Sequence, residues 1–181
     1  MPARPCELQQ RFEALLREHR RIVFHVARMY AGHIDDRHDL VQEICSQLWR
    51  AFPSYDAARR FSTWMYRIAL NTGITHLRQA SARAERFEPL SDELLETVED
   101  DTPSRLADER LRELDALIAQ LDPFDRALIL LHLEDRPYTE IAEVLGISQT
   151  NVATKISRIR QRFRQQRAND AGTPGSTHGT R

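Results

Sequence analysis

The scarcity of glycine is the feature that most constrains how this chain can fold. The 181-residue sequence holds six glycines, and three of them, Gly172, Gly175 and Gly179, fall in the last ten residues. Tight β-hairpins depend on residues that accept a positive φ, most often glycine. The body of the chain is therefore nearly devoid of hairpin turns, and we predict an all-α fold.

Length and composition favour two small helical domains or one large one. Domains commonly span about 100–200 residues. Hydrophobic residues make up 41% of the chain and charged residues 29%, with 26 basic and 27 acidic side chains, so most of the chain can bury a core. Cys6 and Cys45 are too few for a disulfide scaffold, and we expect both to be reduced thiols.

Nothing in the sequence predicts insertion into a membrane. No apolar run approaches the ~18 residues that a bilayer span needs, and the first ten residues lack the apolar core of a signal peptide. We therefore expect a cytoplasmic protein.

The charge is unevenly distributed along the chain. Residues 1–80 carry 12 basic and 8 acidic side chains (+4), residues 81–120 carry 5 and 12 (−7), and residues 121–181 carry 9 and 7 (+2). These shifts predict four segments: an N-terminal lobe (1–80), an acidic flexible linker (81–104), a C-terminal lobe (105–167) and a disordered tail (168–181).

The C-terminal lobe contains a series of helix caps. Asp122 is a favourable N-cap and Pro123 suits a first helical turn, which predicts a helix running to about Leu133. Thr139 is expected to cap a second, short helix, and Gly146 supplies the left-handed residue that ends it. A third helix capped by Ser148 would complete a helix-turn-helix.

That third helix has the pattern of a DNA-recognition helix. Val152, Ile156, Ile159 and Phe163 recur on one face, whereas the opposite face carries hydrogen-bonding groups near its start and arginines further along. A solvated helix face would show the same run of positive charge, but the capped helix-turn-helix favours DNA. The predicted contacts to duplex DNA are Gln149, Thr150, Asn151, Thr154, Lys155, Arg158 and Arg162.

Three helices are predicted in the N-terminal lobe. The first spans Leu8–Tyr30, the second begins near Asp36 or Asp39 and stops before Pro53, and the third runs from about Ser62 to Arg78. The third is apolar over most of its circumference, yet four polar residues share one narrow arc, which favours a binding partner. These residues are Thr63, Arg67, Asn71 and Arg78.

The segment before the third helix combines arginines with aromatic residues. Residues 55–61 read Tyr-Asp-Ala-Ala-Arg-Arg-Phe, and proteins use such combinations to hold unstacked bases. A core role is the alternative for Tyr55, Phe61 and Trp64.

Several of these segments resemble one protein family. Residues 39–43 (DLVQE), 61–71 (FSTWMYRIALN) and 76–78 (HLR) resemble the second conserved domain of bacterial RNA polymerase sigma factors of the extracytoplasmic-function class. Residues 121–164, which include YTEIAEVLGIS at 138–148, resemble the fourth domain of that class. Both lobes match in the order that the family has.

The resemblance implies a transcription initiation factor with no catalytic activity and no cofactor or metal. The acidic second helix would dock on the clamp coiled coil of the polymerase β′ subunit through Asp36, Asp39, Gln42 and Glu43. The fourth domain would meet the β flap and read the −35 element of promoter DNA as a duplex. An inhibitory anti-sigma factor or another regulator is a further expected partner.

By the same resemblance, the loop and the third helix would open the −10 element and capture a flipped base from the single strand. The residues implied are Tyr55, Arg59, Arg60, Phe61, Thr63, Trp64, Arg67, Asn71 and Arg78. His38, preceded by Arg37, stands where the family usually carries an acidic residue, a departure that bears on polymerase affinity.

Two other classes of protein are the alternatives to this one. A DNA-binding regulator would use only the helix-turn-helix and would carry a sensor or dimerisation lobe, for which we would expect a ligand pocket. A metalloenzyme would use the histidines and aspartates between residues 19 and 39, but their spacing does not place two ligands on one helical face in the manner of His-Glu-x-x-His.

Overall fold

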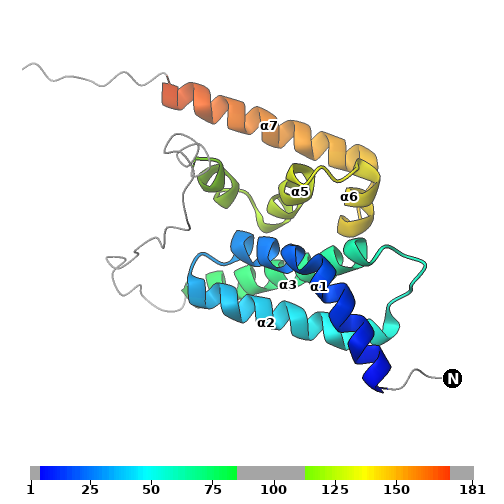
Figure 1. Cartoon of the computed structure of the whole chain (residues 1–181). Helices are drawn as coiled ribbons and strands as arrows, with labels where there is room; N and C mark the ends of the chain where they lie inside the picture. The colour runs from blue at the N-terminus through cyan, green and yellow to red at the C-terminus, as the bar shows by residue number, and fades with distance from the viewer. Residues whose placement is uncertain (1–4, 85–112, 172–181) are drawn as a thin grey trace, which may run out of the picture.

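The chain folds into two helical lobes (Figure 1). The computed structural model describes residues 5–84 and 113–171, and every regular element in these ranges is helical, which confirms the all-α prediction. The N-terminal lobe contains α1 (Pro5–Tyr30), α2 (Ile34–Ala51), the 3-10 turn η1 (Phe52–Ser54) and α3 (Phe61–Ala84). The C-terminal lobe contains a helical stretch at 113–119, α5 (Pro123–Leu133), α6 (Tyr138–Leu145) and α7 (Gln149–Ala171).

The three long helices of the N-terminal lobe pack around a dry core. Val26 of α1, Leu40 and Ile44 of α2 and Met65 of α3 are completely buried. Burying an apolar side chain of this size stabilises a fold by about 1.5–3 kcal/mol, so the apolar faces of these amphipathic helices hold the lobe together.

The turn between α1 and α2 is held by Arg37. Its Nε donates to the carbonyl of Ala31 and its Nη2 to that of Gly32, both at 3.0 Å. Helix α2 begins at Ile34, earlier than the predicted start at Asp36 or Asp39. Arg37, which precedes the unusual His38 of the family motif, therefore has hydrogen-bond partners within the chain.

The predicted caps of the C-terminal lobe are mostly confirmed. The side chain of Asp122 accepts from the backbone N–H groups of Phe124 and Asp125 at 2.9 Å. Burial by itself would raise the pKa of Asp122, but these hydrogen bonds and the charge of Lys155 lower it below its usual value. At the other end of the helix-turn-helix hairpin, Gly146 has φ 69° and ends α6 in the left-handed conformation.

One predicted cap is wrong. Pro137, not Thr139, is the N-cap of α6, so Thr139 lies inside the first turn. The fixed φ of proline and the extended ψ of 147° direct the chain into the helix without a side-chain cap. Ser148 does cap α7, since its Oγ accepts from the backbone N–H of Asn151 at 3.2 Å.

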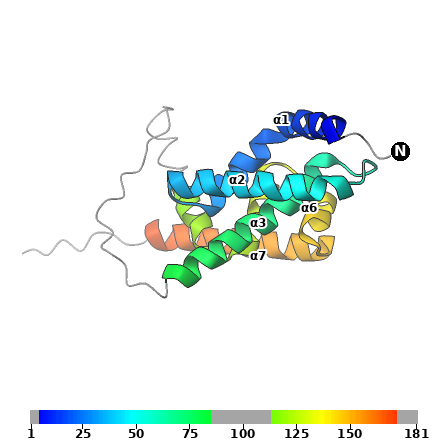
Figure 2. The ribbon, with the colours of Figure 1, turned by 90° about the horizontal axis from the view of Figure 1, so that it is seen from below.

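The two lobes pack directly against each other, with α3 lying against α5 and α6 (Figures 1 and 2). The segment boundaries inferred from charge are approximate, because α3 continues to Ala84 and α7 to Ala171. The remainder of the predicted linker and of the predicted tail lies outside the described residues.

Candidate polymerase and nucleic-acid interfaces

The acidic face of α2 is accessible. Asp36, Asp39 and Glu43 are exposed and line a groove of about 410 Å³ between α2 and α3, which His76 and Gln79 close from the α3 side. Glu43 Oε2 lies 3.9 Å from His76 Nδ1. Gln42 is also exposed but does not line this groove. The structure therefore brings together three of the four predicted docking residues.

The loop before α3 is held in a defined turn. The side chain of Asp56 accepts from the backbone N–H of Ala58 at 2.9 Å, and the hydroxyl of Tyr55 donates to the carbonyl of Arg59 at 2.6 Å. Arg59 and Arg60 remain exposed on this turn. Both guanidinium groups reach solvent, although Arg60 Nη1 also lies 3.9 Å from Glu140 Oε2 of the C-terminal lobe.

The aromatic residues around this loop pack on one another. The ring of Tyr55 stacks on Phe52 at 5.9 Å with an interplanar angle of 15°, and its centroid lies 5.0 Å from that of Trp64. Phe61 is only 6% exposed and completes the cluster. In this structure Phe61 is a core residue, whereas Tyr55 and Trp64 are half-buried.

The polar arc of α3 divides into an exposed part and a covered part. Arg67, Asn71 and Arg78 are exposed, but Thr63 is buried and donates a hydrogen bond of 3.0 Å to Glu140 of α6. Most of the arc is exposed to solvent, and the C-terminal lobe covers the rest.

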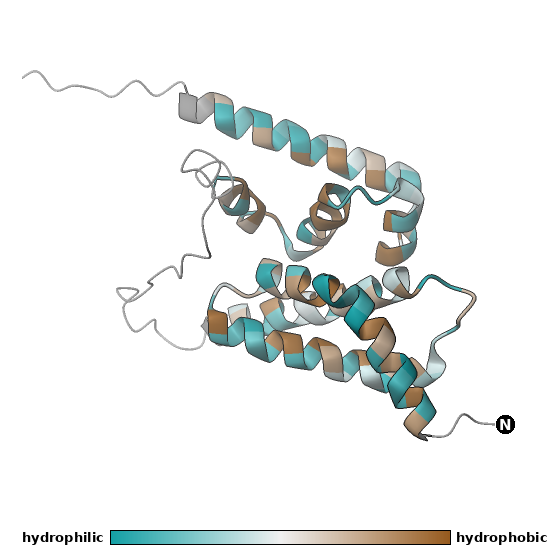
Figure 3. Cartoon of the chain, viewed as in Figure 1, coloured by the Kyte–Doolittle hydropathy of each residue, from teal (hydrophilic) through white to brown (hydrophobic). Residues whose placement is uncertain are grey.

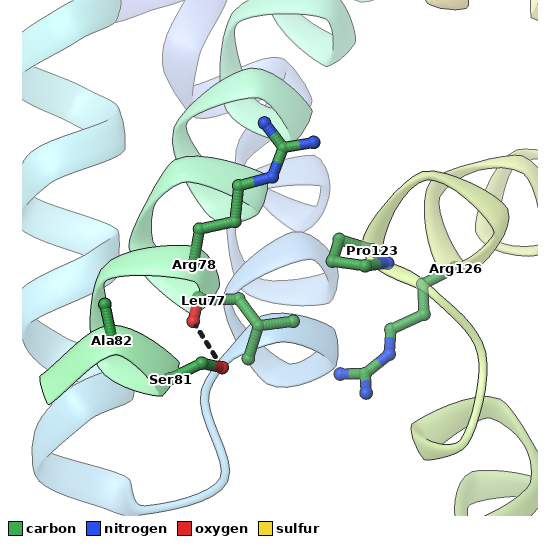
Figure 4. Close-up of a pocket in the computed structure, with 6 residues that line it drawn as sticks. All are labelled: Leu77, Arg78, Ser81, Ala82, Pro123 and Arg126. Carbon is green, nitrogen blue, oxygen red and sulfur yellow. Dashed lines mark hydrogen bonds between the residues drawn. The ribbon is translucent and has the colours of Figure 1, made fainter. Parts of the chain in front are cut away.

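A small cavity of about 330 Å³ lies where α3 passes the start of α5 (Figure 4). Leu77 and Pro123 are among the residues that line it, and Ser81 Oγ donates to the carbonyl of Leu77 at 3.0 Å. Arg78 and Arg126 do not converge on a common point in the close-up. Arg126 is instead held by the carbonyls of its own lobe, with Nε donating to Leu121 at 3.0 Å. The cavity is a gap in the packing between the lobes.

Helix α7 buries one face and exposes another. Val152, Ile156 and Ile159 are buried against α5 and α6, and hydrophilic residues cover most of the remaining surface (Figure 3). The helix lies on the side of its lobe that faces away from α1–α3 (Figure 1). Six of the seven predicted duplex contacts are exposed here: Gln149, Thr150, Asn151, Thr154, Arg158 and Arg162.

Lys155 stands apart from that set. Its Nζ lies 2.7 Å from Asp125 Oδ1 and 5.3 Å from the centroid of the Phe124 ring. The side chain is half-buried and joins α7 to α5. In this structure its charge is directed towards its own lobe.

Two glutamates that the sequence reasoning did not select lie between the lobes. Glu140 is only 8% exposed, and Glu134 bonds to side chains of the N-terminal lobe. No pattern in the sequence predicts that these glutamates contact the other lobe. Each lies in or next to a helix of its own lobe, where an acidic residue needs no distant partner.

Among the residues that the structure describes, no group of three or more His, Cys, Asp or Glu side chains is placed to hold a metal ion. Within the same ranges, no helix is both long and apolar enough to cross a bilayer.

Comparison with known proteins matches both lobes. Residues 15–83 match the family model for sigma-70 region 2, and residues 111–163 match that for sigma-70 region 4. The chain is 31% identical over 140 residues to the ECF RNA polymerase sigma-E factor of Haemophilus influenzae, covering 70% of this chain and 72% of the relative. It is 30% identical over 157 residues to the ECF RNA polymerase sigma factor SigE of Mycolicibacterium smegmatis, covering 84% of this chain and 60% of the relative.

A solved structure shares the arrangement of the helices. CnrH, determined in complex with the cytosolic domain of CnrY, superposes with a TM-score of 0.61 and 25% sequence identity, covering 91% of each chain. These regions define a two-domain, helix-turn-helix transcription factor. The chain belongs to the ECF sigma factors of the sigma-70 family, non-enzymatic factors that direct RNA polymerase to promoters for transcription initiation.

Proposed function

We propose that this chain binds core RNA polymerase, directs it to promoters with a −35 and a −10 element, and assists strand opening. The observation that carries the proposal is the presence of two exposed polar helix faces, one on α3 of region 2 and one on α7 of region 4. Since polymerase is a cytoplasmic enzyme, the site of action would be the cytoplasm.

Each interface has its own role in this proposal. The acidic groove of Asp36, Asp39 and Glu43 receives the β′ clamp coiled coil, and region 4 meets the β flap. Arg67 and Asn71 contact the opened −10 strand, with an amide that can both donate to and accept from a base edge. Thr150, Asn151 and Thr154 read duplex bases at −35, while Arg158 and Arg162 hold phosphates.

The packed lobes do not match the geometry of a promoter. The two elements are centred about 25 base pairs apart, or roughly 85 Å at 3.4 Å per base pair. Helix α7, the longest in its lobe, is 23 residues, or about 35 Å at 1.5 Å per residue. Because α3 and α6 touch, we expect the two polar faces to lie too close together to reach both elements at once. The lobes therefore separate in the promoter complex.

A regulatory partner that holds the free factor inactive is also part of the proposal. CnrH was captured with the cytosolic domain of CnrY, and this chain covers 91% of CnrH. An anti-sigma factor or an equivalent regulator is the partner to seek.

Transcription in vitro tests the function. Core polymerase of the source bacterium would be incubated with the full chain and fragmented genomic DNA, and transcript 5′ ends would be sequenced. We expect discrete start sites that depend on the chain and share two upstream motifs about 25 base pairs apart. A regulator that uses only its helix-turn-helix would bind DNA and yield no start sites with core enzyme alone, and that result would refute the proposal.

A further inference from the structure

Two carboxylates of the −35 lobe face the −10 lobe. The first is Glu140, which has one oxygen 3.0 Å from Thr63 Oγ1 and 3.2 Å from Arg136 Nη1. Its other oxygen lies 3.9 Å from Arg60 Nη1. Thr63 and Arg60 are both among the residues expected to contact −10 DNA, so a single acidic side chain of region 4 meets two of them.

The second carboxylate strengthens the same contact. Glu134 Oε1 lies 2.8 Å from His25 Nδ1, and its other oxygen accepts from the hydroxyl of Tyr66. The guanidinium of Arg136 lies 5.1 Å from the centroid of the Tyr66 ring. Glu134, Arg136 and Glu140 thus form one polar cluster against α1 and α3.

We propose that this cluster is an internal competitor for −10 DNA, in which the Glu140 carboxylate occupies the place of a DNA phosphate on Thr63 and Arg60. The inference rests on the function proposed above. A carboxylate and a phosphate are both anionic acceptors for hydroxyl and guanidinium donors, so one can replace the other on the same side chains. In the free chain region 4 covers Thr63 and places a carboxylate beside the exposed Arg60, and binding of polymerase removes both contacts by separating the lobes.

Several features of this contact favour separation of the two lobes. Arg136 Nε is buried without an acceptor in the described structure, and an unsatisfied buried donor costs free energy. The Arg60 side chain is 79% exposed and its ion pair with Glu140 is long. The cavity between Leu77 and Pro123 leaves part of the seam unfilled. Contacts of this kind between domains of one chain resemble transient interfaces.

The competition is limited to one edge of the −10 surface. Arg67 and Asn71 are exposed although the lobes are packed. We therefore expect the free chain to retain weak affinity for single-stranded DNA, and the affinity to rise when the cluster is removed.

Glu140→Ala and Glu143→Ala form a matched pair for the test. Both remove one negative charge from α6, but Glu143 is exposed and has no described contact with the N-terminal lobe. The dissociation constant of the full chain for a fluorescein-labelled 20-nucleotide DNA of mixed sequence would be measured by anisotropy without polymerase. We expect Glu140→Ala to bind at least five-fold more tightly than the unmodified chain and Glu143→Ala to stay within two-fold of it.

A second variant separates lobe opening from the loss of a charge. Tyr30→Phe removes the hydrogen bond of 2.6 Å to the carbonyl of Pro123, at a distance along α1 from the Glu140 cluster, and keeps the ring. Both Tyr30→Phe and Glu140→Ala should increase the radius of gyration measured by small-angle X-ray scattering, and thermal unfolding followed by circular dichroism would establish that each is folded. If Glu140→Ala does not fold, the Tyr30→Phe result decides.

The inference is overturned if Glu140→Ala binds the oligonucleotide no more tightly than Glu143→Ala, or if neither opened variant changes the radius of gyration. The proposed function would still stand in that case, provided that the unmodified chain supports transcription with core polymerase. Absence of such transcription would instead remove the proposed function, while scattering would still report whether the lobes are packed. The two failures are therefore distinguishable.

Discussion

The ring of Tyr30 packs so closely on Gly73 that a side chain at residue 73 would clash with it between α1 and α3. A Cβ at residue 73 would lie 2.7 Å from Tyr30 Cδ2. The same ring directs its hydroxyl to the carbonyl of Pro123 in the other lobe. Burial raises the pKa of Tyr30 well above its usual value, so the hydroxyl remains a donor throughout the physiological range. A glycine within one lobe thus positions a contact between the lobes.

Gly73→Ala should therefore destabilise the protein although alanine is the better helix former. We expect a loss of about 1–3 kcal/mol from overpacking, measured by chemical denaturation. Gly32→Ala is the matched control, because no atom lies within 4 Å of a Cβ there, and it should be neutral or slightly stabilising. Equal stability of the two variants would contradict the close contact with Tyr30.

Reversing charge in the α2 groove should abolish polymerase binding. Asp39→Lys combined with Glu43→Lys places two cations where the structure exposes two anions. The melting temperature should change little, since exposed charges contribute little to folding. Co-purification with core polymerase is the measurement. Glu13→Lys combined with Glu18→Lys makes the same change of charge on α1 and should co-purify normally; undiminished binding of the groove variant would refute the docking assignment.

Base reading and phosphate contacts should separate along α7. Arg162→Ala should weaken binding to all duplexes and flatten the dependence of log affinity on log salt by about one unit of slope. Gln165→Ala, an uncharged neighbour on the exposed surface, should leave the slope unchanged. Substitutions at Thr150, Asn151 and Thr154 should alter the preferred −35 sequence in a selection from random DNA, and an unaltered preference would contradict their assignment to base reading.

Asn71 should act in strand opening. Asn71→Ala is expected to leave polymerase binding intact and to reduce permanganate reactivity of the −10 thymines on duplex promoter. Tyr55→Ala should also reduce opening, because it removes a stacking contact of roughly 1–3 kcal/mol per base. A promoter with a pre-melted bubble should restore much of the open complex to this variant, since the bases are then already unpaired. Thr75→Ala, one turn further along α3, alters a hydroxyl that bonds only its own helix in the described structure and serves as the control. Normal reactivity in Asn71→Ala would leave this residue without a role in opening.

Stability of region 4 should fall in mild acid through His132. Burial and the charge of Arg160, whose Nη2 lies 2.7 Å from His132 Nε2, lower the pKa of His132 below 6.5 in the folded chain. The unfolded chain then binds the proton more tightly, so this contribution is complete above pH 6.5 and is lost as the pH falls through the folded-state pKa. The melting temperature should drop from pH 7.5 to 5.5 by less in His132→Asn than in the unmodified chain. The comparison is needed because the chain contains seven histidines.

Local signals in the sequence were sufficient for the helices and for several of their ends. The cap at Asp122, the left-handed Gly146 and the apolar repeat of Val152, Ile156 and Ile159 each depend on neighbours within one or two turns. The start of α6 was misplaced because Thr139 has the side chain of a typical cap, whereas the backbone angles make Pro137 the N-cap.

The site was predicted in part for the same reason. Exposed carboxylates on α2 and exposed polar groups on α7 follow from helical periodicity, which also places Arg67 and Asn71 on one arc of α3. Periodicity does not reveal that Lys155 pairs with Asp125, because the two residues are 30 positions apart. It also does not reveal that Phe61 lies inside an aromatic cluster, because η1 brings Phe52 to it.

The amino-acid sequence by itself determined the all-α class, the order of the two regions and the family, since each follows from periodicity, caps and motifs that are local in the chain. Only the tertiary structure decided that region 4 rests on region 2 and that Thr63 is buried under Glu140, 77 residues away. Neither residue carries a sign of the other in its own segment. A hydrogen bond between distant side chains depends on where whole helices pack, and that is fixed by the sum of many contacts and not by any single pattern.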